Sequence, residues 1–372
     1  MLDRRRKVLS CAASCCTKKA MREITPQLDG KLKIHFGDSV ARSGPYPVER
    51  FNELVRIVAE LSYLNKESLL VYRGQSRDFL NKAGASSLYP PLYRRNALSK
   101  VRVKRDFSLL DELSDILVEE TRKLDRRAGD ELRKRRYLRQ SILQHYQVCE
   151  TPLLDLSQSL RAACSFAQSS ASTGSASTGG KSFGDTLAGS ALAETGKPSL
   201  AGSSSDERVY LYVFALPFPT GSISIDSREE IVTVRLLSAC PSLIRRPYFQ
   251  DALMAGTVDI SDNYEDKNEL DFNRRLVAKF SIPVGDKFWE HGPGRIEGAL
   301  LFPGVEEDPM FQLCSTLQSA VSSLEGLLFS PTEHGALRGD GEEVSREVSK
   351  GPAAETVISV QDIAYRLRRR LG

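Results

Sequence analysis

Residues 169–205 consist almost entirely of serine, glycine, alanine and threonine, and this run limits how the rest of the chain can fold. It holds few large apolar side chains, so it cannot bury enough surface to offset the entropy lost on ordering. The sequence on either side reads as parts of one fold. We therefore predict one domain over residues 47–308, in which 169–205 is a flexible insertion and not a domain boundary.

Both ends of the chain are predicted to lie outside this domain. Residues 1–46 are expected to form a basic, mostly disordered tail, although the alternation over 31–36 would suit a short strand. Basic residues at 4–7 precede an apolar stretch, but that stretch is short and soon followed by further lysines, so we predict no secretory signal. Lipidation of the N-terminal cysteines is the alternative. Residues 309–372 are predicted to be a C-terminal helical extension.

Apolar runs and amphipathic stretches follow one another without strict alternation, which favours an α+β fold. We expect a central, mostly antiparallel sheet with flanking helices. The predicted strands lie at 68–73, 209–216, 231–237, 274–282 and 298–302. Helices are predicted at 47–63, 311–328 and 360–371, and over 104–146 with a break near Gly129.

The composition excludes several classes of protein. The chain has 372 residues, of which 41% are hydrophobic, and its net charge of +4 is too small for a dedicated nucleic-acid binder. Its seven cysteines form no repeated CxxC pattern, and its four histidines are far apart. These features predict no disulfide framework, no metal site and a cytoplasmic location. No apolar run reaches the roughly 18 residues that a membrane-spanning helix needs.

Three polar clusters stand at the ends of apolar runs. The first contains Tyr72-Arg73-Gly74-Gln75-Ser76, where a planar guanidinium next to glycine suits binding of a carboxylate or phosphate. The second joins His145 and Asp155, a pair able to exchange or orient a proton near neutral pH. The third contains Gln250. Alternatively, Arg73 pairs with a buried acid, and His145 and Asp155 serve only the fold.

Two basic runs lie on predicted helices, at 133–136 and 366–370. Such a run is usually a solvated helix face. The alternative is a weak contact with an acidic protein or a nucleic acid.

The clusters, in this order, resemble the FRG domain family, named for a Phe-Arg-Gly motif that reads Tyr72-Arg73-Gly74 here. The resemblance covers about residues 47–304. It rests on these segments: Arg73 to Ser76, Gln144-His145-Tyr146, Thr151 to Asp155, Phe166-Ala167, Arg245 or Arg246 with Gln250, and Phe302-Pro303. The chain departs from the family pattern at Gln147, at Leu156-Ser157 and at Gly304, and one extra residue precedes Thr151. These departures point to a divergent copy.

By analogy between motifs, the chain also resembles ADP-ribosyltransferase-like folds that use NAD, and the function expected from this resemblance is linked to bacterial defence or stress. Arg73 would hold the cofactor phosphate, Ser157 or Thr151 would fill the second motif, and Gln250 would stand where a glutamate is usual. Glu265 and Glu269 are possible substitutes for that glutamate. The predicted catalytic residues are Arg73, His145, Asp155 and Gln250. The predicted ligand-binding residues are Tyr72, Gly74, Gln75, Ser76, Tyr146, Thr151 and Ser157.

Two other functions remain open from the sequence. One is a non-enzymatic sensor that recognises a nucleotide, a protein or a nucleic acid through the same polar clusters. The other is a nuclease using His145 and Asp155, which the lack of an acidic metal-binding cluster disfavours.

Overall fold

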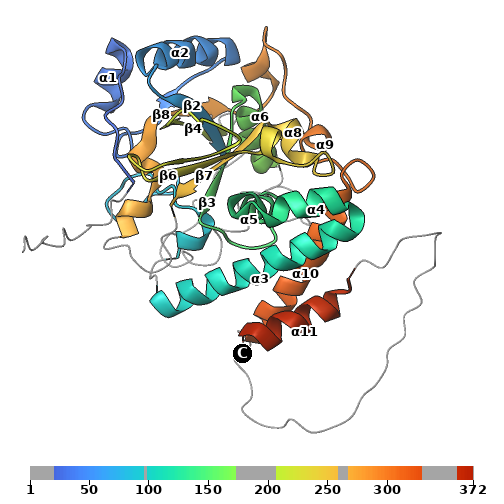
Figure 1. Ribbon diagram of the computed structural model, residues 1–372. Coiled ribbons are helices and arrows are strands. Elements are labelled where there is room, and N and C mark those ends of the chain that lie inside the picture. The colour runs from blue at the N-terminus through green and yellow to red at the C-terminus, as the bar shows by residue number, and fades with distance from the viewer. Residues whose placement is uncertain (1–20, 96–98, 173–206, 259–266, 329–357, 372) are drawn as a thin grey trace, which may run out of the picture.

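The computed structural model describes residues 21–95, 99–172, 207–258, 267–328 and 358–371. These residues form an α+β fold around an eight-stranded mixed sheet in the order β1-β8-β4-β2-β3-β7-β6-β5. Only the β1–β8 pair is parallel, and the other six pairs are antiparallel. Figure 1 shows helices on both sides of the sheet, with α2 and α6 on one side and α3, α5 and α10 on the other.

The strands are short and mostly buried. They are β1 (Tyr46–Pro47), β2 (Leu69–Gln75), β3 (Leu153–Ser157), β4 (Arg208–Leu216), β5 (Ile223–Asp226), β6 (Ile231–Arg235), β7 (Ala252–Thr257) and β8 (Leu276–Pro283). Strand β4 lies between β2 and β8, as its run of β-branched and aromatic residues predicts for a central strand. Strand β2 continues through Gly74 to Gln75, whereas the predicted strand ended at Arg73.

The helices divide between the two faces of the sheet. They are α1 (Gly30–Phe36), α2 (Phe51–Leu64), α3 (Lys100–Leu124), α4 (Arg126–Arg133), α5 (Arg136–His145), α6 (Leu160–Ser172), α7 (Leu236–Ala239), α8 (Arg246–Gln250), α9 (Gly298–Leu301), α10 (Pro309–Leu328) and α11 (Val360–Leu371). Short 3₁₀ turns are η1 (Pro91–Tyr93), η3 (Lys267–Leu270), η4 (Phe272–Arg275) and η5 (Asp286–Trp289). The predicted helices at 47–63, 311–328 and 360–371 are confirmed.

The alternation of side chains along β3 separates two apolar clusters. Leu154 and Leu156 belong to the cluster that contains α2 and α6 residues. Leu153 belongs to the other cluster, with residues of α3, α5 and α10. Because side chains alternate along a strand, Asp155 points to the same side as Leu153. The Asp155 carboxylate therefore lies on the face of the sheet that α5 covers.

Two predicted strands are helices instead. The segment Lys31–Phe36 lies in α1, because the Asp29 side chain accepts a hydrogen bond from Leu32 N and caps the helix there. Leu32 and Phe36, four residues apart, are its buried residues, and an alternating segment this short fits either period. The segment 298–302 holds the single turn α9, which buries Leu301.

Residues 21–46 pack against the sheet, although we predicted them to belong to a tail. Met21 is fully buried, and Arg275 Nη1 donates to the carbonyl of Arg22 at 3.1 Å. Residues 1–20 lie outside the described residues, as do 173–206, which make up most of the predicted insertion.

The predicted break near Gly129 is also wrong. Helix α3 ends at Leu124, and Asp125 caps the next helix by accepting from Arg127 N and Ala128 N. Gly129 lies inside α4, where an added Cβ would stand 1.9 Å from Arg122 Cγ. The glycine therefore permits the close approach of α3 and α4 and does not end a helix.

Candidate functional site

Strands β2 and β3 separate almost as soon as they meet, and Arg73 lies where they part. Their only paired residues are Tyr72 and Ser157, whereas β2 pairs with β4 along its whole length. The Arg73 side chain crosses this gap, and its Nη1 donates to the carbonyl oxygen of Asp155 at 2.6 Å. The gap therefore brings together residues that are 82 positions apart in the chain.

His145 completes a chain of contacts on the same face. It is the last residue of α5 and is fully buried, and its Nδ1 lies 3.4 Å from Asp155 Oδ2. Neither ring nitrogen makes a hydrogen bond to any described residue. The predicted catalytic side chains of His145 and Asp155 thus contact each other, and the backbone carbonyl of Asp155 holds Arg73.

A second arginine adds positive charge beside Arg73. Arg94 follows η1, and its Nε donates to the carbonyl of Tyr89 at 3.1 Å. Burial lowers the pKa of Arg94 to about 9, with further lowering from the charge of Arg73 and an opposing effect of Glu150. Burial likewise lowers the pKa of Arg73, and Asp155 opposes that shift. Two half-buried guanidinium groups within electrostatic range of each other favour an anion.

We call the residues around this gap, namely Arg73, Gln75, Arg94, His145 and Asp155, the gap site. Gln75 shares a face of β2 with Arg73, because the two are separated by one residue of an extended strand. Its Oε1 is buried without a hydrogen bond to any described residue, and so is Arg73 Nε. Buried polar atoms of this kind are rare in folded proteins and gather where ligands bind.

Gln250, the fourth predicted catalytic residue, is used by the fold. It is 2% exposed, and its Nε2 donates to the carbonyl of Leu301 in α9 at 2.6 Å. Its own carbonyl accepts from Ser157 Oγ at 2.7 Å. The side chains of Gln250 and Ser157 therefore fasten α8 to α9 and to the end of β3.

Two further predicted ligand-binding residues have internal partners. Thr151 is fully buried and donates its hydroxyl to Gln144 Oε1 at 2.9 Å. Tyr146 donates its hydroxyl to Asp308, and burial together with this carboxylate raises the pKa of the phenol well above its ordinary value. Both residues connect the end of α5 to neighbouring segments.

Sequence reasoning missed the centre of this network, Asp308. Its Oδ2 also accepts from Arg246 N at 3.1 Å, and its Oδ1 accepts from Met310 N at 3.2 Å. The Arg246 guanidinium lies over the rings of Tyr146 and Phe302, at 5.4 Å and 4.9 Å from their centroids. An Asp-Pro pair in front of a helical stretch is the signal that points to a capping aspartate here.

Gly74 and Tyr72 face the opposite side of the sheet from Arg73, where α6 packs. An added Cβ on Gly74 would stand 2.0 Å from Ala163 O and 2.9 Å from Ala167 Cβ. Tyr72 is buried beside Cys164 of the same helix, and burial raises the pKa of its phenol. The Arg-Gly and Phe-Ala motifs thus meet as a tight helix–sheet contact. Ser76 is half-buried just beyond the end of β2.

A buried polar row continues from Arg73 across the sheet and was also missed. Tyr212 of β4 is opposite Arg73, and Lys279 of β8 is opposite Tyr212. Asp78 joins the row, accepting from Tyr212 Oη at 2.9 Å and from Lys279 Nζ at 3.0 Å. Lys279 also donates to Ser86 Oγ at 2.7 Å. In the sequence, this row is signalled by a lysine inside an apolar strand. Through Asp78 and Ser86, Lys279 anchors the segment that leads from β2 to Arg94.

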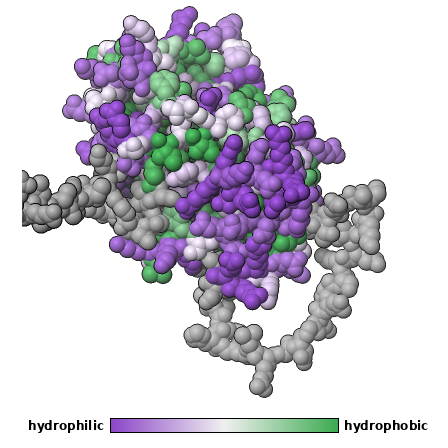
Figure 2. Space-filling model, in the orientation of Figure 1, coloured by the Kyte–Doolittle hydropathy of each residue, from purple (hydrophilic) through white to green (hydrophobic). Residues whose placement is uncertain are grey.

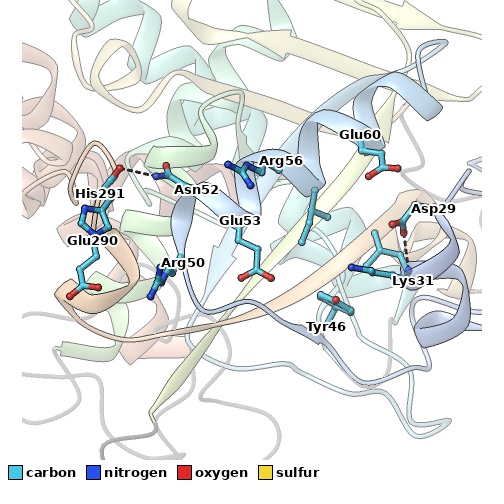
Figure 3. Close-up of a pocket in the computed structure, with 12 residues that line it drawn as sticks. Asp29, Lys31, Tyr46, Arg50, Asn52, Glu53, Arg56, Glu60, Glu290 and His291 are labelled. Atoms are coloured by element: carbon cyan, nitrogen blue, oxygen red, sulfur yellow. Dashed lines mark hydrogen bonds between the residues drawn. The ribbon is translucent and has the colours of Figure 1, made fainter.

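A groove on a different part of the surface has a volume of about 620 Å³. Figure 3 shows side chains of both charges around it, among them Glu53 and Arg56 on α2, Arg50 just before that helix, and Glu290 and His291 beside them. None of the gap-site residues lines it. The groove carries no set of buried polar groups like that of the gap site.

The basic runs lie mostly at the surface. Arg133, Lys134 and Arg136 are exposed, whereas Arg135 is half-buried and donates to the carbonyl of Ala239 at 3.2 Å. Arg368, Arg369 and Arg370 of α11 are exposed as well. Figure 2 shows a largely hydrophilic surface over the helices in this part of the molecule.

Among the described residues, no three histidine, cysteine or acidic side chains are grouped so that they could hold a metal ion. The described helices are too short or too polar to cross a membrane. Four described cysteines, at positions 149, 164, 240 and 314, are free thiols.

Comparison with family models, with curated proteins and with solved structures found no match for this chain.

Proposed function

We propose that this chain is a divergent FRG-type domain whose gap site binds a phosphate-bearing nucleotide of the NAD and ADP-ribose class. The observation that carries the proposal is the pair of half-buried arginines at the β2–β3 gap. Arg73 and Arg94 lie close enough for one charge to lower the pKa of the other. A diphosphate would relieve that repulsion.

The geometry of Arg73 suits this ligand. Its Nη1 is held by the Asp155 carbonyl, which fixes the plane of the guanidinium, while Nε makes no hydrogen bond to a described residue. A guanidinium oriented in this way presents its remaining donors in a rigid fork that matches phosphate oxygens. His145 does not contact this guanidinium directly but lies 3.4 Å from the side chain of Asp155, whose carbonyl holds it.

We propose binding or sensing, and not group transfer, as the main role. In a transferase a carboxylate would stabilise the positive charge that develops on the ribose. At the corresponding position here, the amide of Gln250 is buried and donates to Leu301 O. Glu269 is half-buried in η3, and Glu265 lies outside the described residues.

Calorimetric titration with NAD, ADP-ribose, AMP and inorganic pyrophosphate tests this proposal. Arg73→Lys keeps the charge but loses the fork, so affinity should fall by about 10- to 100-fold, the value of a charge-assisted hydrogen bond of roughly 1.5–3 kcal/mol. The melting temperature should change little, because lysine still reaches an acceptor at the gap. Arg73→Ala should weaken binding further.

Arg135→Lys is the matched control, because Arg135 is also half-buried and also donates to a backbone carbonyl, that of Ala239, and is not one of the gap-site residues. It should bind every ligand like the wild type. Unchanged affinity in both Arg73 variants, together with a large loss of stability, would make Arg73 a structural residue. Release of nicotinamide from NAD, followed by chromatography, would instead favour the transferase reading.

The exposed basic residues favour a second candidate, docking of an acidic protein or a nucleic acid on α4, α5 and α11. Arg133, Lys134 and Arg136 lie on one stretch of chain, and Arg368 to Arg370 on another. Binding of a short oligonucleotide should then fall steeply with salt and with the triple change Arg368→Gln, Arg369→Gln and Arg370→Gln. Salt-independent or undetectable binding would remove this candidate.

A further inference from the structure

We infer that Gln75 and Tyr210 form a subsite for the adenine base, next to the phosphate-binding arginines. This inference rests on the proposed function and names the part of the ligand, its base, that side chains of the sheet would recognise. It starts from the register of β2 and β4, in which Gln75 is paired with Tyr210 and Arg73 is paired with Tyr212. All four side chains therefore lie on one face of the sheet.

The two pairs are not equivalent. Tyr212 is fully buried, and its hydroxyl is taken by Asp78 at 2.9 Å. Tyr210 and Gln75 are half-buried, so part of each residue is exposed at the surface. Along β4, two residues or about 7 Å therefore separate the buried Tyr212 from the partly exposed pair of Tyr210 and Gln75.

The chemistry of the open patch suits a neutral aromatic base. An amide carries both a donor and an acceptor, and glutamine pairs in this way with the amino group and ring nitrogen of adenine. Gln75 Oε1 is buried and makes no hydrogen bond to a described residue, so its acceptor capacity is unfilled and a donor group of a ligand would fill it. The ring of Tyr210 supplies a surface on which a base can stack.

The neighbouring charges limit what else this patch accepts. Lys279 and Asp78 pair at 3.0 Å and Ser86 bonds to both, so this flank presents no uncompensated charge. Positive charge lies on the β3 side of this row, at Arg73 and Arg94, each with one carboxylate within electrostatic range, that of Asp155 and that of Glu150. A ligand with a neutral base at one end and phosphates at the other therefore fits across the two rows.

The test separates the base from the phosphates by titrating inorganic pyrophosphate, ribose 5-phosphate and ADP into the wild type and three variants. Gln75→Leu should lower the affinity for ADP by about 5- to 100-fold, the usual discrimination of a bidentate base contact. Its affinity for pyrophosphate should stay within about twofold, which also shows that the variant is folded. Tyr210→Leu should behave like Gln75→Leu, and Tyr210→Phe, which keeps the ring, should behave like the wild type.

Gln312→Leu, an exposed glutamine of α10, is the control and should change neither affinity. Equal affinities of ADP and ribose 5-phosphate in the wild type would overturn the base subsite and leave the phosphate site standing. An equal loss of pyrophosphate and ADP in Gln75→Leu would overturn it as well. Failure of the wild type to bind any of the three ligands would instead overturn the proposed function itself.

Discussion

Arg73 and Gly74 are neighbours in the sequence but serve opposite faces of the sheet. From the sequence, the glycine suggests close approach of a ligand to the backbone beside Arg73. In the structure its hydrogen faces α6, with Ala163 O at 2.0 Å from the position of an added Cβ. The proposed ligand-binding role of Arg73 therefore rests on its contact with Asp155 and on the nearby charge of Arg94, and not on the residue that follows it.

Gly74→Ala should destabilise the fold strongly, because the methyl group would meet backbone atoms that cannot rotate away. Overpacking of this kind costs roughly 1–3 kcal/mol, and more where the contact is with backbone. Chemical denaturation measures the change in the free energy of unfolding. Gly298→Ala is the matched control, because nothing lies within 4 Å of its added Cβ, and its stability should match the wild type. A wild-type stability of Gly74→Ala would show that α6 does not lie on β2 as described.

At the scale of elements, α11 is a separate helix that packs on α3 and α10. Ile363, Ala364 and Leu367 are buried there in the same apolar cluster as α3. Arg366 then fastens the helix, donating to Glu112 Oε1 at 2.7 Å and to both oxygens of Glu119. Glu112 is only 5% exposed, and Arg370 Nη1 lies 3.5 Å from its other carboxylate oxygen.

Arg366→Gln should lower the free energy of unfolding by about 1–3 kcal/mol, because the Glu112 carboxylate stays buried with a weaker partner. Thermal unfolding at low and high salt measures the effect, which should shrink little with salt since the pair is partly shielded from solvent. Arg369→Gln, at an exposed position of the same helix, should be neutral. Equal effects of the two changes would mean that the Glu112 contact contributes nothing.

At the scale of the whole molecule, contacts distant in sequence join the segment that follows β2 to the segment that precedes β8. Asp271, in front of β8, accepts from Leu88 N and from Asn273 N, both at 2.9 Å, and so links residues 183 positions apart. It is 1% exposed, and its Oδ2 makes no hydrogen bond to a described residue. Burial raises the pKa of this carboxyl from 3.8 to about 6.

This shift predicts how stability depends on pH. The folded state binds the proton of Asp271 more tightly than the unfolded state, so its stabilising effect is present below about pH 4 and is lost as pH rises through about 6. The loss amounts to roughly 3 kcal/mol at one pKa unit per 1.36 kcal/mol. Asp271→Asn should remove this pH dependence, because an amide does not titrate. The variant should therefore be more stable than the wild type at pH 8 and about equally stable at pH 4.

Urea denaturation at pH 4, 6 and 8 measures this dependence. Asp286→Asn, at an exposed carboxylate, is the control and should follow the wild-type curve. A constant difference between Asp271→Asn and the wild type at all three values would contradict the shifted titration.

The sequence by itself determined the elements whose residues repeat a strong local pattern. The apolar stripe of α2 and the β-branched run of β4 need only their own residues to be recognised. The placement of polar residues at the ends of such elements also pointed to Arg73, His145 and Asp155, which the structure brings together. These features are local, because periodicity and chain direction are properties of neighbouring residues.

Only the tertiary structure decided which polar residues are available to a ligand. Ser157, Thr151 and Gln250 are also polar residues near the ends of elements, but the side chain of each bonds to a protein partner. The partners of Ser157 and Gln250 lie 93 and 51 positions away. A hydrogen bond forms between atoms about 3 Å apart, and sequence separation says little about that distance. The buried polar atoms of Arg73 and Gln75 that make no hydrogen bond to a described residue could therefore be recognised only from the assembled sheet.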